Sequence, residues 1–455
     1  DDDATLSIDI NDVLDTGINY GAADSEEDPL IPYIVKGLSG QYHSTFTTLP
    51  FFHHSERYQE DQLRNVWEYR LDIDQDAVDL MTGHTWELLG VKNKYYFFRQ
   101  NCAYRMAEMV ELGTGTELIS KYKVWVAPMD VFHAMMEQDK TIVKSVKRLA
   151  SRETVFNEGY RALSDAEKQF VDTVQSEPGA AIEEQILLSN EEDPREALCV
   201  VLDRFAYQNN MSADRQKEVL LARFQRAPSQ RRDLDPPQPP HEGDKTSLLQ
   251  ASVLQNEDLG TGLELRIRPA YFDFLSKTVG TAPYSELSMA DTRVLIRDSE
   301  IYLRQLEAVR VTALNTNVSG APGAKRYAWR VRLGLQDRDL ACDGCLVGYA
   351  EGGFGRGYQI QDGLAVYGLA SAQFEVGDDA FSTLQAKAIA GAVWTTDTLG
   401  VHLEGAFVNG IDDTDQSKFI GKGELRFGGG KDWEFGAGVR YDEAAEGFLS
   451  LNRYW

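Results

Sequence analysis

The stretch Gly262–Phe272, "GLELRIRPAYF", alternates apolar and charged side chains one residue at a time. In an extended strand successive side chains point to opposite faces, so Leu263 and Tyr271 share one face, whereas Glu264 and Arg266 share the other. This period of two predicts a strand with one apolar and one polar surface.

The same alternation returns in "AWRVRLGLQ" from Ala328, "GKGELRFGG" from Gly421 and "EFGAGVRY" from Glu434. About twelve such segments follow residue 240, each of about ten residues, which is the length of a tilted strand that crosses a bilayer. The polar faces mix Arg with Glu, which suits a narrow lumen filled by paired charges. The chain also ends in "LSLNRYW" on an aromatic residue, Trp455, as bacterial outer-membrane barrels do.

These features predict that residues 246–455 form one closed antiparallel β-barrel in an outer membrane. A soluble sandwich that buries its apolar face between two sheets is the alternative. The barrel prediction turns one set of apolar side chains toward lipid: Leu263, Leu265, Trp329, Leu333 and Phe427. It turns one set of charged side chains toward the lumen: Arg266, Arg330, Glu424 and Arg426.

The composition excludes some classes of function. The 455 residues carry 72 Asp and Glu against 46 Lys and Arg, a formal net charge of −26. A nucleic-acid surface needs a concentrated excess of Lys and Arg, so we predict no nucleic-acid partner. No run of about 18 apolar residues occurs, so no transmembrane helix is predicted. The chain opens on "DDDATLSIDI" without a signal peptide, and we expect its numbering to start after processing or truncation.

Helical patterns dominate from about residue 60 to residue 225. There, Ser164 is predicted to cap a helix together with Glu167, three residues later, as a capping box. A stretch with five prolines, Arg226–Thr246, cannot form a packed element and is predicted to be a linker. The predicted order of domains is an α+β domain over 1–150, a helical extension over 151–225, a Pro-rich linker over 226–245 and the barrel over 246–455.

A second informative stretch is Lys94–Gly113, "KYYFFRQNCAYRMAEMVELG". The aromatic run Tyr95–Phe98 suits a buried strand, and apolar residues then recur at helical spacing until Gly113. Cys102 falls at the predicted helix N-terminus, where the helix dipole and unpaired N–H groups favour a thiolate. The alternative is a small buried hydrophobe, since free cysteine is commonly buried.

The other three cysteines have different predicted roles. Cys199 lies inside a helical pattern and is predicted to be a core residue. Cys342 and Cys345 form the pair in "CDGC", which is predicted to be a small loop disulfide in an oxidising compartment. A single CxxC pair cannot complete a four-ligand zinc site, and we predict neither a metal nor a cofactor.

The N-terminal part, from about Leu14 to Phe132, carries several family motifs. They are "WEY" at Trp67–Tyr69, "HTWEL" at His84–Leu88 and "YYFF…NC", which ends at Cys102. On these motifs the chain resembles the DUF4105 family, whose members include the Lnb lipoprotein N-acyltransferases. The part after the linker is similar to the β-rich C-terminal region of proteobacterial members.

The resemblance implies a periplasm-facing thiol acyltransferase with a permuted papain-like core, related to the NlpC/P60 and LRAT enzymes. It also implies a barrel in the Gram-negative outer membrane. Family members usually carry a histidine base in an "FGHTFLR"-like strand ahead of the region that matches "VLDTGINYGA". Here only "DDDATLSIDI" precedes that region, so we expect the histidine to lie upstream of this chain or to be missing.

The resemblance also assigns roles to residues. Cys102 is the predicted nucleophile, with its own N–H group as an oxyanion donor. His84 is a candidate base or orienter, unless it only braces the core. Asn101 would orient a histidine or, more ordinarily, bond the backbone of the turn. Five further residues would line the site or meet lipid phosphate, unless they are simply solvated: His43, His53, His54, Arg99 and Arg105.

The predicted reaction moves an acyl chain from a membrane phospholipid, through a thioester on Cys102, to an amine such as a lipoprotein N-terminus. One alternative is a non-catalytic outer-membrane binding or scaffold protein with a degenerate papain-like domain. A lipid hydrolase and a peptidoglycan amidase are the others. The absent histidine favours the binding protein, whereas an upstream "GHT" would favour the enzyme.

Overall fold

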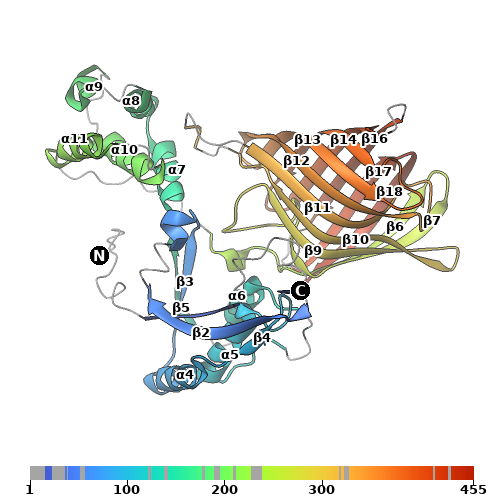
Figure 1. Cartoon of the computed structure of the whole chain (residues 1–455), viewed down its shortest axis with the longest axis horizontal. Helices are drawn as coiled ribbons and strands as arrows, with labels where there is room; N and C mark the ends of the chain where they lie inside the picture. Colours follow the sequence, from blue (N-terminus) through green and yellow to red (C-terminus); the bar gives the residue numbers. More distant parts are fainter. Residues whose placement is uncertain are drawn as a thin grey trace. The chain divides into compact units, whose positions relative to one another are not determined.

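The computed structural model divides the chain into two compact units, each with its own core (Figure 1). The first unit holds residues 1–124, 135–239 and 318–324, and the second holds residues 125–134, 240–317 and 325–455. The structure describes residues 16–22, 36–37, 39–51, 57–120, 123, 125–137, 142–176, 180–188, 195–208, 212–226, 238–316, 319–321, 327–412, 416–428 and 432–455.

The first unit has an α/β part built on two small antiparallel sheets. Three strands pair in the order β1 (Thr16–Ala22), β2 (Tyr42–Pro50) and β4 (Asn93–Tyr95). A separate sheet pairs β3 (Val66–Leu71) with β5 (Val143–Leu149). The N-terminal α/β region is therefore present, as predicted.

Two helices of this part contact each other, α4 (Gln75–Leu88) and α5 (Cys102–Thr114). Helix α4 is capped by Asp74, whose carboxylate accepts a hydrogen bond from the Ala77 N–H at 2.9 Å. Helix α5 ends on Gly115, which adopts a left-handed φ of 68°. The predicted stop at Gly113 is thus two residues early, because the glycine with the left-handed backbone is the one that ends the helix.

The helical part of the first unit packs around one apolar core that includes Phe156, Phe170 and Val219. The predicted capping box is confirmed. The Ser164 N–H donates to Glu167 Oε2 at 2.6 Å, and the Glu167 N–H donates to Ser164 Oγ at 3.2 Å. The described helices of this part are α7 (Arg152–Ala162), α8 (Asp165–Ser176), α9 (Ile182–Leu188), α10 (Arg195–Gln208) and α11 (Ala213–Phe224). Residues 227–237 of the predicted linker lie outside the described residues.

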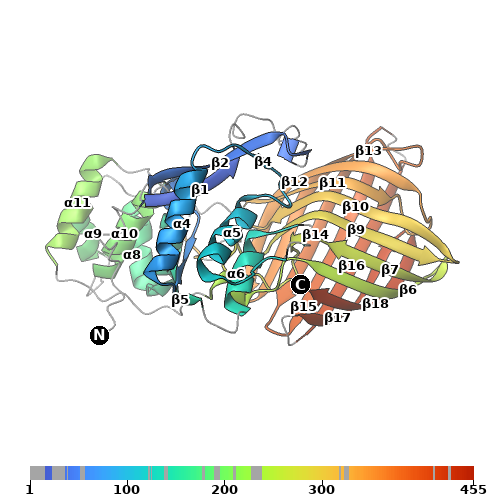
Figure 2. The ribbon, with the colours of Figure 1, turned by 90° about the horizontal axis from the view of Figure 1, so that it is seen from below.

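The second unit is a closed antiparallel β-barrel, as predicted (Figure 2). Its sheet holds thirteen strands, of which the short β8 (Ala270–Phe272) pairs only with β9, so twelve strands form the wall. The pairing of β9 with β10 closes the ring, in a register that runs from Glu300↔Arg297 to Ala313↔Ser285. The wall strands are β6 (Leu248–Asn256), β7 (Gly260–Arg268), β9 (Ser285–Arg297), β10 (Glu300–Ala313), β11 (Tyr327–Asp337), β12 (Leu346–Gln361), β13 (Leu364–Val376), β14 (Leu384–Thr395), β15 (Leu399–Gly410), β16 (Ser417–Phe427), β17 (Trp433–Asp442) and β18 (Ala444–Tyr454).

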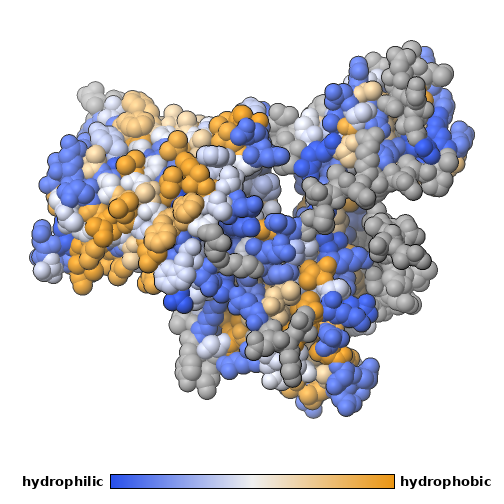
Figure 3. Space-filling model, turned by 180° about the vertical axis from the view of Figure 1, so that it is seen from behind, coloured by the Kyte–Doolittle hydropathy of each residue, from blue (hydrophilic) through white to orange (hydrophobic). Residues whose placement is uncertain are grey.

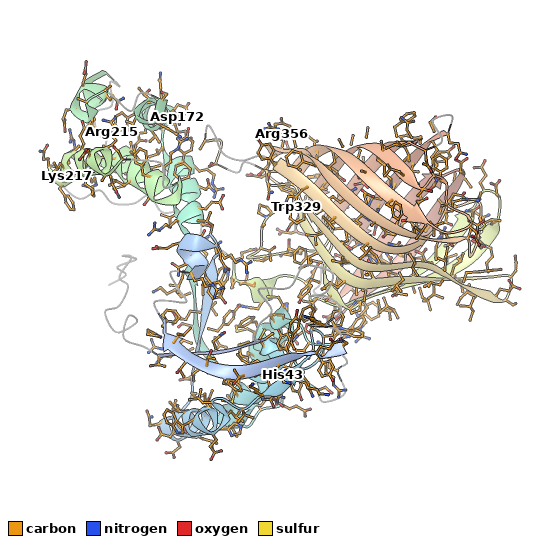
Figure 4. The ribbon with its side chains drawn as sticks, in the orientation of Figure 1. His43, Asp172, Arg215, Lys217, Trp329 and Arg356 are labelled. Atoms are coloured by element: carbon orange, nitrogen blue, oxygen red, sulfur yellow. A yellow bond between two sulfur atoms is a disulfide. The ribbon has the colours of Figure 1, made fainter. Side chains whose placement is uncertain are left out.

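The two faces of the wall have the predicted orientation, and the sandwich alternative is wrong. The exposed fraction is 50% for Leu263 and 56% for Phe427, but only 2% for Arg266 and 2% for Arg426. Figure 3 shows apolar side chains gathered over the outer surface of the barrel strands. Trp329, marked on β11 in Figure 4, belongs to this outer set. The barrel therefore presents an apolar wall around a charged interior, as an outer-membrane barrel does.

One predicted strand is interrupted. Strand β7 ends at Arg268, whereas the sequence pattern runs on through Tyr271. The next residue, Pro269, has no N–H group to donate to the sheet, so the ladder breaks there and resumes as β8, which pairs with β9 in the same register as β7. The residues that follow β8, Asp273–Ser276, are buried.

The barrel has two rims with different connections. Strand β6 begins and β18 ends at the same rim, which we call the near rim, and the Trp455 N–H donates there to the Ser247 carbonyl at 3.1 Å. At the opposite, far rim the connections are short: the longest has eight residues, 338–345, and β17 turns into β18 through Glu443 alone.

The segment Trp125–Ala134 belongs to the second unit and packs beside the start of β6. The indole Nε1–H of Trp125 donates a hydrogen bond to Ser247 Oγ at 2.8 Å. Thr246 Oγ1 donates a second one to Asp130 Oδ1 at 2.7 Å. The ring of Trp125 lies 6.4 Å from that of Trp455. This segment includes most of the first two turns of α6 (Pro128–Glu137). No helix within the described ranges combines the length and apolar character needed to cross a bilayer.

Candidate functional site

The Cys102 side chain is exposed at the first residue of α5. Asn101, directly before it, is buried and caps the helix, because its Oδ1 accepts a hydrogen bond from the Tyr104 N–H at 3.0 Å. The Asn101 amide also donates to the Phe97 carbonyl at 2.9 Å. One side chain thus ties the preceding turn to the helix and holds the thiol at the positive end of the helix dipole.

An aromatic cluster on one face of the β1–β2–β4 sheet lies beside the thiol. The Tyr95 hydroxyl is 4.0 Å from Cys102 Sγ, a long and therefore weak hydrogen bond. The ring of Tyr95 lies 6.5 Å from that of Tyr20, which in turn lies 4.7 Å from that of Phe46. The sheet thus offers the sulfur an aromatic neighbour with a single hydroxyl donor.

The aromatic run after β4 is not a strand throughout, which corrects the prediction. Strand β4 ends at Tyr95, and Phe97 lies in a bend, where its N–H donates to the Gly37 carbonyl at 3.0 Å. The Phe97 ring fills the space beside Gly37 so closely that a Cβ on this glycine would lie 2.2 Å from it. The chain has to bend here because Asn101 holds the Phe97 carbonyl.

A polar network lies behind the cysteine on α5. Arg105 pairs with Glu108 at 2.6 Å and also bonds the hydroxyl of Tyr20, which contacts Ser44 Oγ at 2.5 Å. Burial acts to lower the pKa of Arg105, but Glu108 and Tyr20 raise it above its usual value. Burial and the negative charge of Glu108 raise the pKa of Tyr104. The predicted phosphate-binding role of Arg105 therefore competes with an internal partner, whereas Arg99 is exposed.

The histidines do not gather at the thiol in the described part of the chain. His43, marked on β2 in Figure 4, follows Tyr42 and precedes Ser44, both of which are buried on the Tyr95 face. Side chains alternate along a strand, so His43 belongs to the opposite face of the sheet from Cys102. His84 has its described ionic partner on its own helix, Glu87 at 3.8 Å.

Two predicted residues, His53 and His54, lie outside the described residues. Within the described ranges, no group of three or more His, Cys, Asp or Glu side chains is arranged to hold a metal ion.

The remaining cysteines belong to other elements of the chain. Cys199 is half-buried in α10, and its sulfur accepts a hydrogen bond from Arg223 Nε at 3.0 Å. Cys342 and Cys345 are joined in a disulfide with their Cα atoms 5.9 Å apart. The sequence pattern did not reveal Tyr95 as the neighbour of the thiol or Tyr20 as the neighbour of Tyr95, although the aromatic run that contains Tyr95 was a visible signal.

Comparisons with known proteins match two separate regions of the chain. Residues 3–138 match a family model described as the Lnb N-terminal periplasmic domain. Residues 237–454 match a second one, described as a domain of unknown function, DUF7840. A comparison with curated proteins returns no match.

Several solved outer-membrane structures are similar in fold to the barrel alone. The KdgM porin in complex with disordered oligogalacturonate is 9% identical, with 46% of this chain and 99% of that chain covered at a TM-score of 0.29. The COG4313 outer membrane channel from Pseudomonas putida F1 is 11% identical, with 49% and 100% covered at a TM-score of 0.30. The closure of the barrel is shown by the pairing of β9 with β10. The chain thus carries a region that matches the Lnb N-terminal periplasmic domain, followed by a closed barrel of twelve wall strands with the apolar outer face of an outer-membrane barrel.

Proposed function

We propose that this protein is a thiol acyltransferase anchored in the outer membrane, with Cys102 as the acyl carrier. The observation that carries the proposal is the exposed sulfur at the N-terminus of α5, held there by the buried cap Asn101. A helix that begins with cysteine and lies beside an antiparallel sheet is the arrangement that a papain-like thiol enzyme requires. The match of residues 3–138 to the Lnb periplasmic domain supports the same reading.

The proposed chemistry passes through a thioester. The Cys102 thiolate attacks the ester carbonyl carbon of a phospholipid, the bond to the glycerol oxygen breaks, and the leaving lysophospholipid oxygen takes a proton from water. An amine such as a lipoprotein N-terminus then attacks the thioester, loses a proton as the amide forms, and releases the thiolate. The N–H groups of Cys102 and Ala103, ahead of the Tyr104 N–H that Asn101 already accepts, are the proposed donors to the oxyanion in both steps.

Two features of the described chain would stabilise the thiolate form of Cys102. One is the helix N-terminus, and the other is the Tyr95 hydroxyl, which is the described partner of the sulfur. The proposal assigns no histidine as the base. The exposed Arg99, three residues before Cys102, is the proposed contact for lipid phosphate, because Arg105 is already bound by Glu108.

The test is covalent capture of the acyl group. Full-length protein in detergent micelles is incubated with a phospholipid whose acyl chain carries an alkyne tag, and the adduct is read on a denaturing gel. We expect a tagged band that hydroxylamine removes and that Cys102→Ala abolishes. The matched control is Cys199→Ala, which removes the other free thiol and should keep the band.

A second candidate function is a non-catalytic anchored binding protein, and one observation favours it. Within the described ranges, His84 is paired on its own helix and His43 belongs to the far face of the sheet. If iodoacetamide labels Cys102 but tagged phospholipid leaves no adduct in a chain with its native N-terminus, the acyltransferase proposal is wrong. An adduct that decays to free fatty acid, with no amine acylated, would indicate the lipid hydrolase instead.

A further inference from the structure

The barrel interior contains a segment of the chain that is not part of the wall. This plug segment, Asp273–Ser276, follows β8 at the near rim. Its first residue, Asp273, caps its own turn, because Oδ1 accepts hydrogen bonds from the N–H groups of Leu275 at 3.2 Å and Ser276 at 3.1 Å.

Asp273 also binds three arginines of the wall. Its carboxylate lies 2.9 Å from the guanidinium of Arg426, 2.8 Å from that of Arg268 and 3.3 Å from that of Arg266. Arg266 and Arg268 belong to β7, whereas Arg426 belongs to β16, four strands away around the wall. A single carboxylate thus ties the plug segment to two separate parts of the barrel wall.

The next plug residue, Phe274, packs in an apolar core inside the lumen. Its ring lies 6.0 Å from that of Tyr367 and 5.1 Å from that of His402, and it is almost fully buried. Leu275 packs beside Gly400, where a Cβ would lie 3.2 Å from the leucine side chain. The apolar core that surrounds Phe274 is formed by Leu314, Ala328, Ala365, Tyr367, Leu369, Ile389, Val393 and Ala406.

Farther along the lumen, charged side chains neutralise one another across neighbouring strands. The Glu264 carboxylate pairs with three arginines. Its oxygens lie 2.7 Å from the guanidinium of Arg293, 3.2 Å from that of Arg304 and 2.9 Å from that of Arg440. Five further lumenal carboxylates are paired in the same way: Asp291 with Arg266, Glu307 with Arg310 and Arg332, Glu351 with Lys387, Glu404 with Arg330 and Lys422, and Glu446 with Arg304.

The far end of the lumen is crossed by the connection 338–345. The Leu340 N–H donates to the Asp442 carbonyl at 3.0 Å, and the Leu340 carbonyl accepts from Asn256 Nδ2 at 2.8 Å. A cavity of about 270 Å³ remains inside the lumen, lined at one end by the plug segment and at the other by Asp339 and Leu340.

We propose that this barrel is sealed against ions, and that Asp273 is the latch that holds the plug segment in the lumen. Barrels of 16 to 18 strands leave an aqueous channel, whereas those of about eight strands fill with side chains. Twelve strands give a lumen too wide to be filled by the wall alone, and the plug segment and its ion pairs occupy the remainder. The barrel is then an anchor that keeps the permeability barrier of its membrane intact.

Planar-bilayer conductance of the full-length protein tests the proposal. We expect the wild-type chain to insert without current steps and Asp273→Ala to produce discrete steps, because three arginines lose their shared partner and release the plug segment. The matched control is Asp397→Ala, which removes a carboxylate at the same rim that is 93% exposed and 3.9 Å from Lys277. This control should stay silent.

Folding of every variant is checked by the gel mobility shift that an intact barrel shows before heating. If Asp273→Ala does not fold, Asp273→Asn replaces it, because the amide keeps an oxygen for the turn but loses the charge that binds the arginines. Current steps from the wild-type chain overturn the seal. Silence of a folded Asp273 variant overturns the latch.

Discussion

At the scale of the single residue, one neighbour of Cys102 sets the position of the sulfur and another affects its ionisation. Asn101 fixes where the sulfur lies, since its amide bonds backbone groups on both sides of the cysteine. Tyr95 acts on the sulfur itself, through a hydroxyl at 4.0 Å. A donor to sulfur favours the thiolate over the thiol, so the two neighbours have different expected effects on chemistry.

We predict that Tyr95→Phe slows iodoacetamide labelling of Cys102 at neutral pH. An ordinary neutral hydrogen bond contributes a net of about 0.5–1.5 kcal/mol, and this long one belongs at the low end, so its loss should slow labelling by about twofold. The measurement is the labelling rate against pH, read by mass spectrometry of the peptide that contains Cys102.

Tyr96→Phe is the control, because it makes the same change one residue later, where the ring packs against Gly40. It should leave the labelling rate unchanged. Equal rates for wild type and Tyr95→Phe would show that the long contact has no effect on the sulfur.

At this scale the sequence allowed part of the site to be predicted. The spacing of apolar residues after Cys102 was enough to place it at a helix start, because helix periodicity is a local property. The face of β2 that carries His43 could not be read in the same way. It depends on pairing with β4, fifty residues later, and on which face the helix covers.

At the scale of the element, two glycines test how α4 and α5 pack. Gly83 on α4 has open space around a built Cβ, whereas a Cβ on Gly113 of α5 would lie 2.3 Å from the sulfur of Met81. A substitution at Gly83 therefore reports helix propensity alone, whereas one at Gly113 also reports the contact between the two helices.

We predict that Gly83→Ala raises the free energy of unfolding of the first unit by about 1 kcal/mol, since glycine disfavours a helix interior by that amount. Gly113→Ala should instead lower it by about 1 kcal/mol, because displacement of Met81 costs more than the helix gains. Urea unfolding of the full chain, followed by helical circular dichroism, measures both. A stabilised Gly113→Ala variant would contradict the described contact between the helices.

Among the barrel elements, alternation predicted the wall but not its contents. Leu263 and Arg266 were assigned correctly to opposite faces, because each strand follows a period of two regardless of its partner. The alternation continues through Tyr271 in β8, and Pro269 only interrupts the ladder with β9. The entry of the plug segment into the lumen depends on Arg426 of β16, which no local pattern connects to Asp273.

At the scale of the whole molecule, the disulfide reports the compartment in which the chain folds. Cys342 and Cys345 lie in the far-rim connection 338–345, so this part of the chain must cross the periplasm before it reaches its final position. A disulfide persists in an oxidising envelope but not in a reducing cytoplasm.

We therefore predict that protein isolated from outer membranes carries the Cys342–Cys345 bond. Alkylation without reductant, followed by mass spectrometry, should modify Cys102 and Cys199 but leave the other two cysteines unmodified. Treatment with reductant before alkylation should expose all four. Free thiols at Cys342 and Cys345 in untreated envelopes would contradict both the bond and the route.

The unequal rims determine how much of this protein is exposed on each side of the membrane. Outer-membrane barrels usually carry short turns on the periplasmic side and long loops on the exterior. Here the near rim, which follows the periplasmic domain, carries the long connections 269–284 and 314–326, and the far rim carries none longer than eight residues. The far rim therefore offers a macromolecule that approaches from that side of the membrane very little protein surface to bind.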